Sequence, residues 1–227
     1  MKRIMAVSAG IVSLILLGAC AWLVPPIPLT NPLGLHNAEL EVTVGGVPPM
    51  MGALSVTASG ATGRLQFDDQ SFSLPLNPRS LTVYGGLQGA VTVVPPLDME
   101  CPATMTISHI TLTVRLWDGA ATYGEAPPAR RVNVESSDPR SFALSRDSDV
   151  TPCRYTFDRT DLLAGGLKVE LSGGKLGRAI DIIQSAPTNN HVEAAITMTV
   201  SGTPADPSAG TIIRFTLDMA RGEVRVF

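Results

Sequence analysis

The sequence has 227 residues, of which 17 are lysine or arginine and 20 are aspartate or glutamate, so its net charge is −3 at pH 7. A mildly acidic chain with scattered basic residues lacks the clustered basic face that nucleic-acid binding requires. Aromatic residues make up 5% of the chain. This is too few to fill a core and also provide exposed rings for stacking sugars or bases. These values exclude nucleic-acid binding and disfavour carbohydrate binding.

The first 20 residues carry the features of an export signal. Lys2 and Arg3 are followed by an uncharged apolar run over residues 4–17, and small residues then precede a cysteine. A positive start, an apolar core and small residues in this order are typical of secretory signals. The segment 17–20, Leu-Gly-Ala-Cys, resembles the lipobox of bacterial lipoproteins. The resemblance implies that residues 1–19 are removed and that the sulfur of Cys20 carries a diacylglycerol.

An uncleaved signal anchor is the alternative interpretation of the N-terminus. Residues 4–24 carry no charge and are long enough to cross a bilayer of about 30 Å as a helix. Both interpretations attach the chain to a membrane and place its bulk outside the cytoplasm, at the outer membrane or the cell surface.

Residues 20–36 are expected to form a tether between the anchor and the domain. Prolines at 25, 26, 28 and 32 impose extended geometry, and the segment has no acidic or basic residue. One interpretation places its start at the lipid interface and packs the remainder on its own domain. The other docks the tether into a partner membrane protein, because each solvated Leu, Ile or Val would forgo about 1.5–3 kcal/mol of burial. The residues expected to bind such a partner are Trp22, Ile27, Leu29, Leu33 and Leu35.

From residue 37 to the end, apolar and polar residues alternate with the period of two that is typical of β-strands. The longest run, 104–117, changes phase at Ser108-His109, which predicts a β-bulge or a crossing between sheets. Gly85-Gly86 predicts a tight turn or bulge. Residues 192–200 show the clearest alternation, and 213–217 is expected to pair with them. Lys175 to Ser185 instead has helical spacing and predicts one short helix.

This pattern predicts an all-β domain. Many short antiparallel strands joined by glycine- and proline-rich turns favour a β-sandwich of the immunoglobulin-like type with Greek-key connections and at most one short helix. The expected organisation is a signal peptide at 1–19, the lipidated cysteine and tether at 20–36, and a single domain at 37–227.

Cys101 and Cys153 form an even pair once Cys20 is assigned to lipid, and an exported protein meets an oxidising compartment. Cys153 shares its parity with Tyr155 and Phe157, so it should face the core. A disulfide between Cys101 and Cys153 is therefore predicted, with two buried free thiols as the alternative.

Side chains that could carry chemistry are few. His36, His109 and His191 do not have the spacing of a metal site or a catalytic motif, and the doublet Arg130-Arg131 is interpreted as a solvated strand end. Asp147 and Asp149 could give two oxygens to a weak calcium site. The soft ligands that could hold Cu(I), with the disulfide as the competing use of the cysteine, are Met99, Cys101, Met105 and His109.

These observations predict a non-catalytic protein, without a cofactor other than its lipid, that acts as an accessory or structural subunit of a membrane or surface assembly. The alternative is an extracytoplasmic carrier or sensor that binds a small apolar ligand between its sheets.

Overall fold

A computed structural model of the chain describes residues 25–43, 54–60, 78–93, 100–147, 152–159, 167–185, 190–203 and 210–226. Most of them belong to antiparallel strands, and one α-helix lies among them. The elements are β1 (Ile27–Thr30), β2 (Ala38–Thr43), β3 (Leu54–Gly60), β4 (Ser80–Val93), β5 (Thr104–Asp118), η1 (Pro128–Arg130), β6 (Arg131–Arg146), β7 (Cys153–Arg159), β8 (Leu167–Ser172), α2 (Gly173–Ser185), β9 (Asn190–Thr203) and β10 (Ile212–Arg225).

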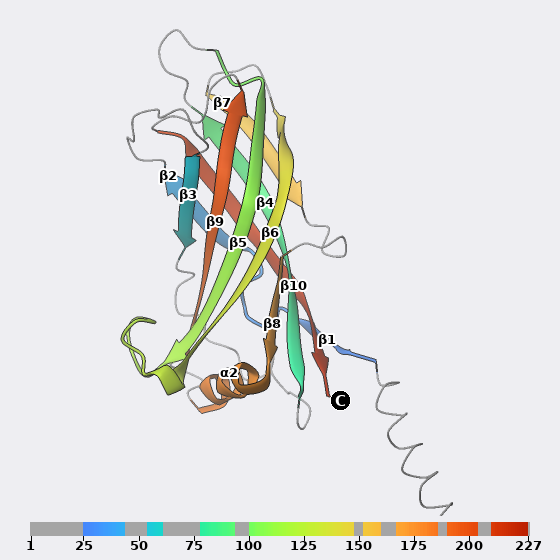
Figure 1. The fold of residues 1–227 in the computed structure, drawn as a ribbon, viewed down its shortest axis with the longest axis vertical. Helices are drawn as coiled ribbons and strands as arrows, with labels where there is room; N and C mark the ends of the chain where they lie inside the picture. Colours follow the sequence, from blue (N-terminus) through green and yellow to red (C-terminus); the bar gives the residue numbers. More distant parts are fainter. Residues whose placement is uncertain are drawn as a thin grey trace, which may run out of the picture.

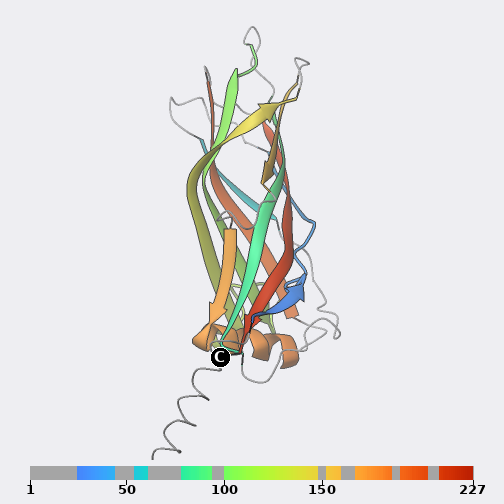
Figure 2. The ribbon, with the colours of Figure 1, turned by 90° about the vertical axis from the view of Figure 1, so that its right-hand side faces the viewer.

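The strands form one strongly curled sheet with two walls (Figures 1 and 2). The first wall runs in the order β6, β5, β9, β3. In the second wall β4 lies beside β10, with β7 and β8 along different parts of its other edge and β1 and β2 along the far edge of β10. The walls are hydrogen-bonded to each other where Ser145 and Arg146 of β6 meet β7. The expected antiparallel β fold with one short helix is confirmed, but its shape is a curled half-barrel rather than a clear two-sheet sandwich.

The core fills the inside of the curl. Along β9 the alternation predicted from the sequence is confirmed, because Val192, Ala194, Ile196, Met198 and Val200 are all buried. The predicted pairing of this strand with residues 213–217 is wrong. β9 pairs with β5 and β3, whereas β10 pairs with β1, β2 and β4. Consecutive strands here cross from one wall to the other instead of forming a hairpin.

The phase change at Ser108-His109 is a β-bulge, as predicted. His109 has a φ of 52°, and the register of β5 shifts at this point against both β6 and β9. The extra residue keeps Ile107 and Ile110 both buried, although they lie at opposite parities. Gly85 and Gly86 lie within β4, opposite a register shift in the neighbouring strand β10. The shift lies between Asp218 and Arg221, so the irregularity expected at the glycines is on the partner strand.

The predicted helix is confirmed as α2, which lies across one end of the half-barrel (Figure 1). Its buried residues Leu176, Ala179, Ile182 and Ile183 recur at helical spacing and close this end of the core. We call it the helix end, and we call the opposite end, where β5 and β7 begin, the disulfide end. In the part of the chain that the structure describes, no helix has the length and hydrophobicity needed to cross a bilayer.

Candidate functional site

The structure integrates the expected tether into the domain. Residues 27–30 form β1 and pair with β10 from Thr30↔Arg221 to Ile27↔Val224. Leu33 and Leu35 are 0% exposed and belong to the core. The core therefore does not begin at the expected boundary between residues 36 and 37, and Leu33 and Leu35 are not available to a partner. Of the other residues expected to bind one, Ile27 is exposed and Leu29 is partly buried.

A tight turn directs the two leucines inward. Asn31 and Gly34 have positive φ values of 45° and 66°, a conformation that asparagine and glycine adopt more readily than other residues. The backbone N–H of Asn31 donates to Ala220 O at 2.7 Å, and that of Asn37 donates to Leu217 O at 2.8 Å. Both bonds join the turn to the region of β10 that bulges. Sequence composition identified an apolar proline-rich segment but could not show that its partner was β10.

The lipidation site and the first tether residue cannot be compared with the fold, since Cys20 and Trp22 lie outside the described residues. What the structure gives is the point where the chain enters the domain. The entry is at the helix end, because Ile27 pairs with Val224 and the following residue, Arg225, pairs with Ser80 at the start of β4. In sequence, the lipidation site predicted at Cys20 lies five residues before Pro25, where the described chain begins.

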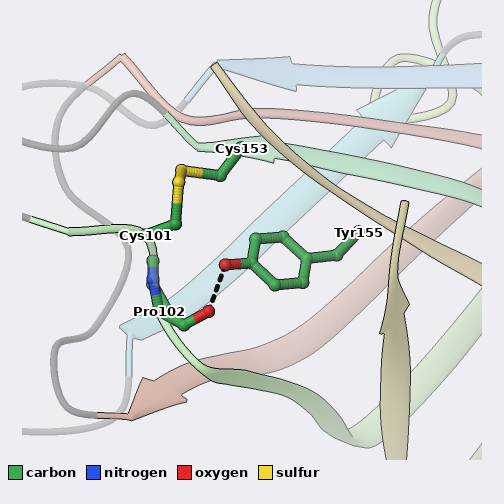
Figure 3. The surroundings of a disulfide bond; sticks show 4 residues. All are labelled: Cys101, Pro102, Cys153 and Tyr155. Carbon is green, nitrogen blue, oxygen red and sulfur yellow. Dashed lines mark hydrogen bonds between the residues drawn. A yellow bond between two sulfur atoms is a disulfide. The ribbon is translucent and has the colours of Figure 1, made fainter. Parts of the chain in front are cut away.

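The predicted disulfide is present between Cys101 and Cys153, with the two Cα atoms 5.8 Å apart (Figure 3). Cys101 precedes β5 of one wall and Cys153 begins β7 of the other, so the bond links the walls. Beside it, the buried hydroxyl of Tyr155 donates a hydrogen bond to Pro102 O. Burial raises the pKa of this phenol above its ordinary value, because desolvation disfavours the charged form.

The residues considered for metals are dispersed. Cys101 is held in the disulfide, Met105 is buried in the core, and His109 is exposed at the bulge with Ser108 Oγ 3.1 Å from its Nδ1. Met99 and Asp149 lie outside the described residues, and Asp147 forms an ion pair with Arg154 at 3.5 Å. Within the described ranges, no three His, Cys, Asp or Glu side chains gather closely enough to hold a metal ion.

A polar cluster at the helix end was missed by the sequence analysis. Asp118 is fully buried and accepts hydrogen bonds from Arg130, one of them 2.6 Å long from Nε. Trp117 stacks on His191, with 5.1 Å between the ring centroids, and meets Tyr123 edge-on. The interpretation of Arg130-Arg131 as a solvated strand end is thus wrong, since Arg130 neutralises a buried carboxylate and Arg131 lies 5.4 Å from the Tyr123 ring centroid. These contacts attach the β5–β6 connection to the end of β5.

The outer face of the second wall carries a shallow concavity of about 740 Å³. We call it the outer concavity. Its lining includes two small residues of β4, Gly89 and Ala90. Gly89 is required by the packing, since a Cβ at this position would lie 2.6 Å from Cδ1 of Phe215 and would also overlap Arg214 O. The charged and polar residues of the lining are chiefly Glu39, Glu41, Gln88, Arg154, Asp158 and Arg214.

The register explains how these side chains come together from distant parts of the sequence. Glu41, Arg214, Ala90 and Thr156 lie side by side on β2, β10, β4 and β7. Arg214 Nε donates to Glu41 Oε2 at 2.7 Å, and this hydrogen bond lowers the pKa of Glu41 below its ordinary value. No short motif in the sequence could predict this grouping, because each strand contributes one or two unremarkable polar residues.

The outer concavity is lined mainly by polar and charged side chains. Its lining supplies carboxylates, guanidinium groups and hydroxyls but neither histidine nor cysteine, so it lacks the usual nucleophile–base pair. It is also on the outside, whereas the interior between the walls is occupied by core side chains such as Leu40, Leu112 and Phe215.

Comparison with known proteins does not assign the chain. No family model and no curated protein matches its sequence.

Proposed function

We propose that this protein is a lipid-anchored subunit of a cell-envelope assembly, attached to the membrane through Cys20 and without catalytic activity of its own. The observation that carries the proposal is the short separation in sequence between the predicted lipidation site, Cys20, and the first described strand. The segment after the lipobox-like sequence continues into β1, and Leu33 and Leu35 are buried in the core. An anchor joined in this way holds the domain at a fixed place on the membrane, as a structural subunit requires.

Two further observations support the proposal. The disulfide between Cys101 and Cys153 is of the kind that persists in oxidising, extracytoplasmic compartments. The outer concavity offers the subunit a polar, charged surface for a protein partner, with Glu41 and Arg214 already paired at its edge.

The anchor is tested by the intact mass of protein purified from membranes of the native host. The expected mass is that of residues 20–227 plus a diacylglycerol-based lipid, and Cys20→Ala should abolish both processing and lipidation. An unmodified full-length chain would contradict the proposal.

The role as a subunit is tested by affinity purification from solubilised envelopes. Ala90→Arg adds a large side chain to the lining of the outer concavity, and Ala143→Arg makes the same change at an exposed position of β6 on the other wall. We expect a specific set of envelope proteins to co-purify with wild type and with Ala143→Arg, and to be reduced at least several-fold with Ala90→Arg. Equal recovery with both variants would exclude the outer concavity as the binding surface.

A further inference from the structure

The described chain begins at the edge of the helix end. Four paired residues mark one row across the strands β1, β10, β4 and β8: Ile27, Val224, Leu81 and Leu171. Two residues after Leu171 the chain enters α2. The entry of the chain, the end of β10 and the start of α2 therefore share one level of the half-barrel, as Figures 1 and 2 show from two sides.

The connection between the predicted anchor and this level is short. Residues 21–26 separate Cys20 from Ile27, and at 3.3–3.6 Å per residue the seven steps between these two residues span at most about 25 Å. The half-barrel itself is much longer, because β5 has 15 residues and a strand of that length extends about 50 Å. An anchor at Cys20 therefore keeps the helix end near the lipid and leaves room for the disulfide end to stand away from it.

The helix end also carries exposed positive charge. Arg79, Lys175, Arg178 and Arg225 are exposed there, and a 2.7 Å hydrogen bond from Arg79 N to Arg225 O places the first and last of these side by side. The exposed carboxylates described at this end are Asp181 on α2, Glu125 in the β5–β6 connection and Glu170 on β8, and Glu170 is paired with the exposed Lys168 at 3.5 Å. Cations therefore outnumber carboxylates among these residues, a balance that suits a surface of anionic lipid headgroups.

We infer that the helix end lies against the membrane surface, with Arg79, Lys175, Arg178 and Arg225 facing anionic lipid headgroups and the disulfide end pointing away from the bilayer. The inference rests on the proposed function, since it needs the anchor at Cys20. It adds the orientation of the domain and assigns a lipid surface, rather than a protein, to this end.

The orientation is measured with single labels on the lipidated protein. The three cysteines of the sequence are assigned to lipid and to the disulfide, so a new thiol is unique. Gln184→Cys places a fluorophore on the exposed side of α2, and Ser145→Cys places the same fluorophore on an exposed residue near the disulfide end. Each protein is reconstituted into protein-free vesicles of phosphatidylcholine and phosphatidylglycerol that contain a headgroup-attached quencher.

We expect the label at residue 184 to be quenched several-fold more strongly than the label at residue 145. Equal quenching, or stronger quenching at residue 145, would overturn the orientation. Weak quenching at both positions would also overturn it, because the helix end would then require a protein partner to be held near the membrane.

The charge contribution is tested by reversing it. Lys175→Glu with Arg178→Glu should reduce quenching at residue 184 in these vesicles to the level seen in pure phosphatidylcholine. The matched control, Arg146→Glu with Arg154→Glu near the disulfide end, should not. Equal effects of the two pairs would contradict the role of the basic residues. The intact mass of the same preparation separates the two proposals: an unmodified Cys20 contradicts the function, whereas acylated protein without preferential quenching contradicts the orientation alone.

Discussion

The two ends of the half-barrel are closed by different kinds of interaction. At the helix end, α2 inserts Leu176, Ala179 and Ile182 between the walls, and Arg130 neutralises the buried Asp118. At the disulfide end, a covalent bond joins Cys101 of one wall to Cys153 of the other. The helix end is therefore closed by the packing of α2 and by a buried ion pair. The disulfide end is closed by one covalent cross-link.

The segment after β1 is also held by apolar packing, through Leu33 and Leu35. Removing these two side chains should have the largest effect on the free energy of unfolding. Replacing both Leu33 and Leu35 by alanine should lower the free energy of unfolding by about 4–10 kcal/mol, since each buried Leu→Ala costs about 2–5 kcal/mol. Ile27→Ala with Leu29→Ala, at an exposed and a partly buried position, should cost clearly less. Urea unfolding compares the two pairs. A loss below 1 kcal/mol for the first pair would mean that residues 31–37 are not part of the core.

Removing the cross-link should have the next largest effect. The disulfide joins residues that are 52 apart in sequence, and closing such a loop is worth about 4 kcal/mol in the chain-entropy model. Cys101→Ala with Cys153→Ala should lower the free energy of unfolding by about that amount, and a thiol reductant should destabilise wild type but not the variant. If reductant leaves the unfolding midpoint of wild type unchanged, the cross-link does not stabilise this end.

The local pattern of the fold could be predicted, whereas the partners of its segments could not. Alternation along 192–200 identifies the inward side chains, and the phase change at His109 identifies the bulge, because both are properties of neighbouring residues. The pairing of β1 with β10, which precedes the buried Leu33, joins residues that are more than 190 positions apart in sequence. A proline-rich apolar segment has the same composition whether it binds its own sheet or another protein.

The same limit applies to the candidate site. Inward parity and an even cysteine count were sufficient to predict the disulfide. The outer concavity could not be predicted, since Glu41 and Arg214 meet only because β2 and β10 pair in one register. The buried ion pair of Asp118 with Arg130 was missed for a related reason: in the sequence, a strand-end aspartate and an arginine doublet look like solvated surface.

Glycine-to-alanine substitutions should have opposite effects on stability in β4 and in α2. Gly89→Ala should lower the free energy of unfolding by about 1–3 kcal/mol, because the new Cβ meets Phe215 and the backbone of Arg214. Gly177→Ala, on the exposed side of α2 with open space around it, should raise stability by about 0.5–1 kcal/mol. Thermal unfolding of the two variants shows whether each substitution raises or lowers stability. A destabilised Gly177→Ala, or a neutral Gly89→Ala, would contradict the packing described here.

A smaller effect than that of the cross-link is expected from the hydroxyl beside the disulfide. Tyr155→Phe removes the hydrogen bond to Pro102 O and should cost about 1–2 kcal/mol at neutral pH. Burial raises the pKa of Tyr155, so its contribution is complete below about pH 10, the ordinary pKa of tyrosine, and is lost as the pH rises toward the higher value in the fold. The variant should therefore lose less stability than wild type as the pH rises above about 10. Parallel alkaline profiles would show that this phenol does not titrate with unfolding.

Amide hydrogen exchange of the lipidated protein tests most directly whether the anchor leads straight into the fold. We expect the amides of Asn31, Asn37 and Ala38, which donate to backbone carbonyls, to exchange as slowly as those at the centre of β10. Exchange of these amides at the rate of an unstructured peptide, with β10 still protected, would contradict it. The segment would then be a flexible leash, and neither the fixed attachment nor the orientation inferred from it would stand.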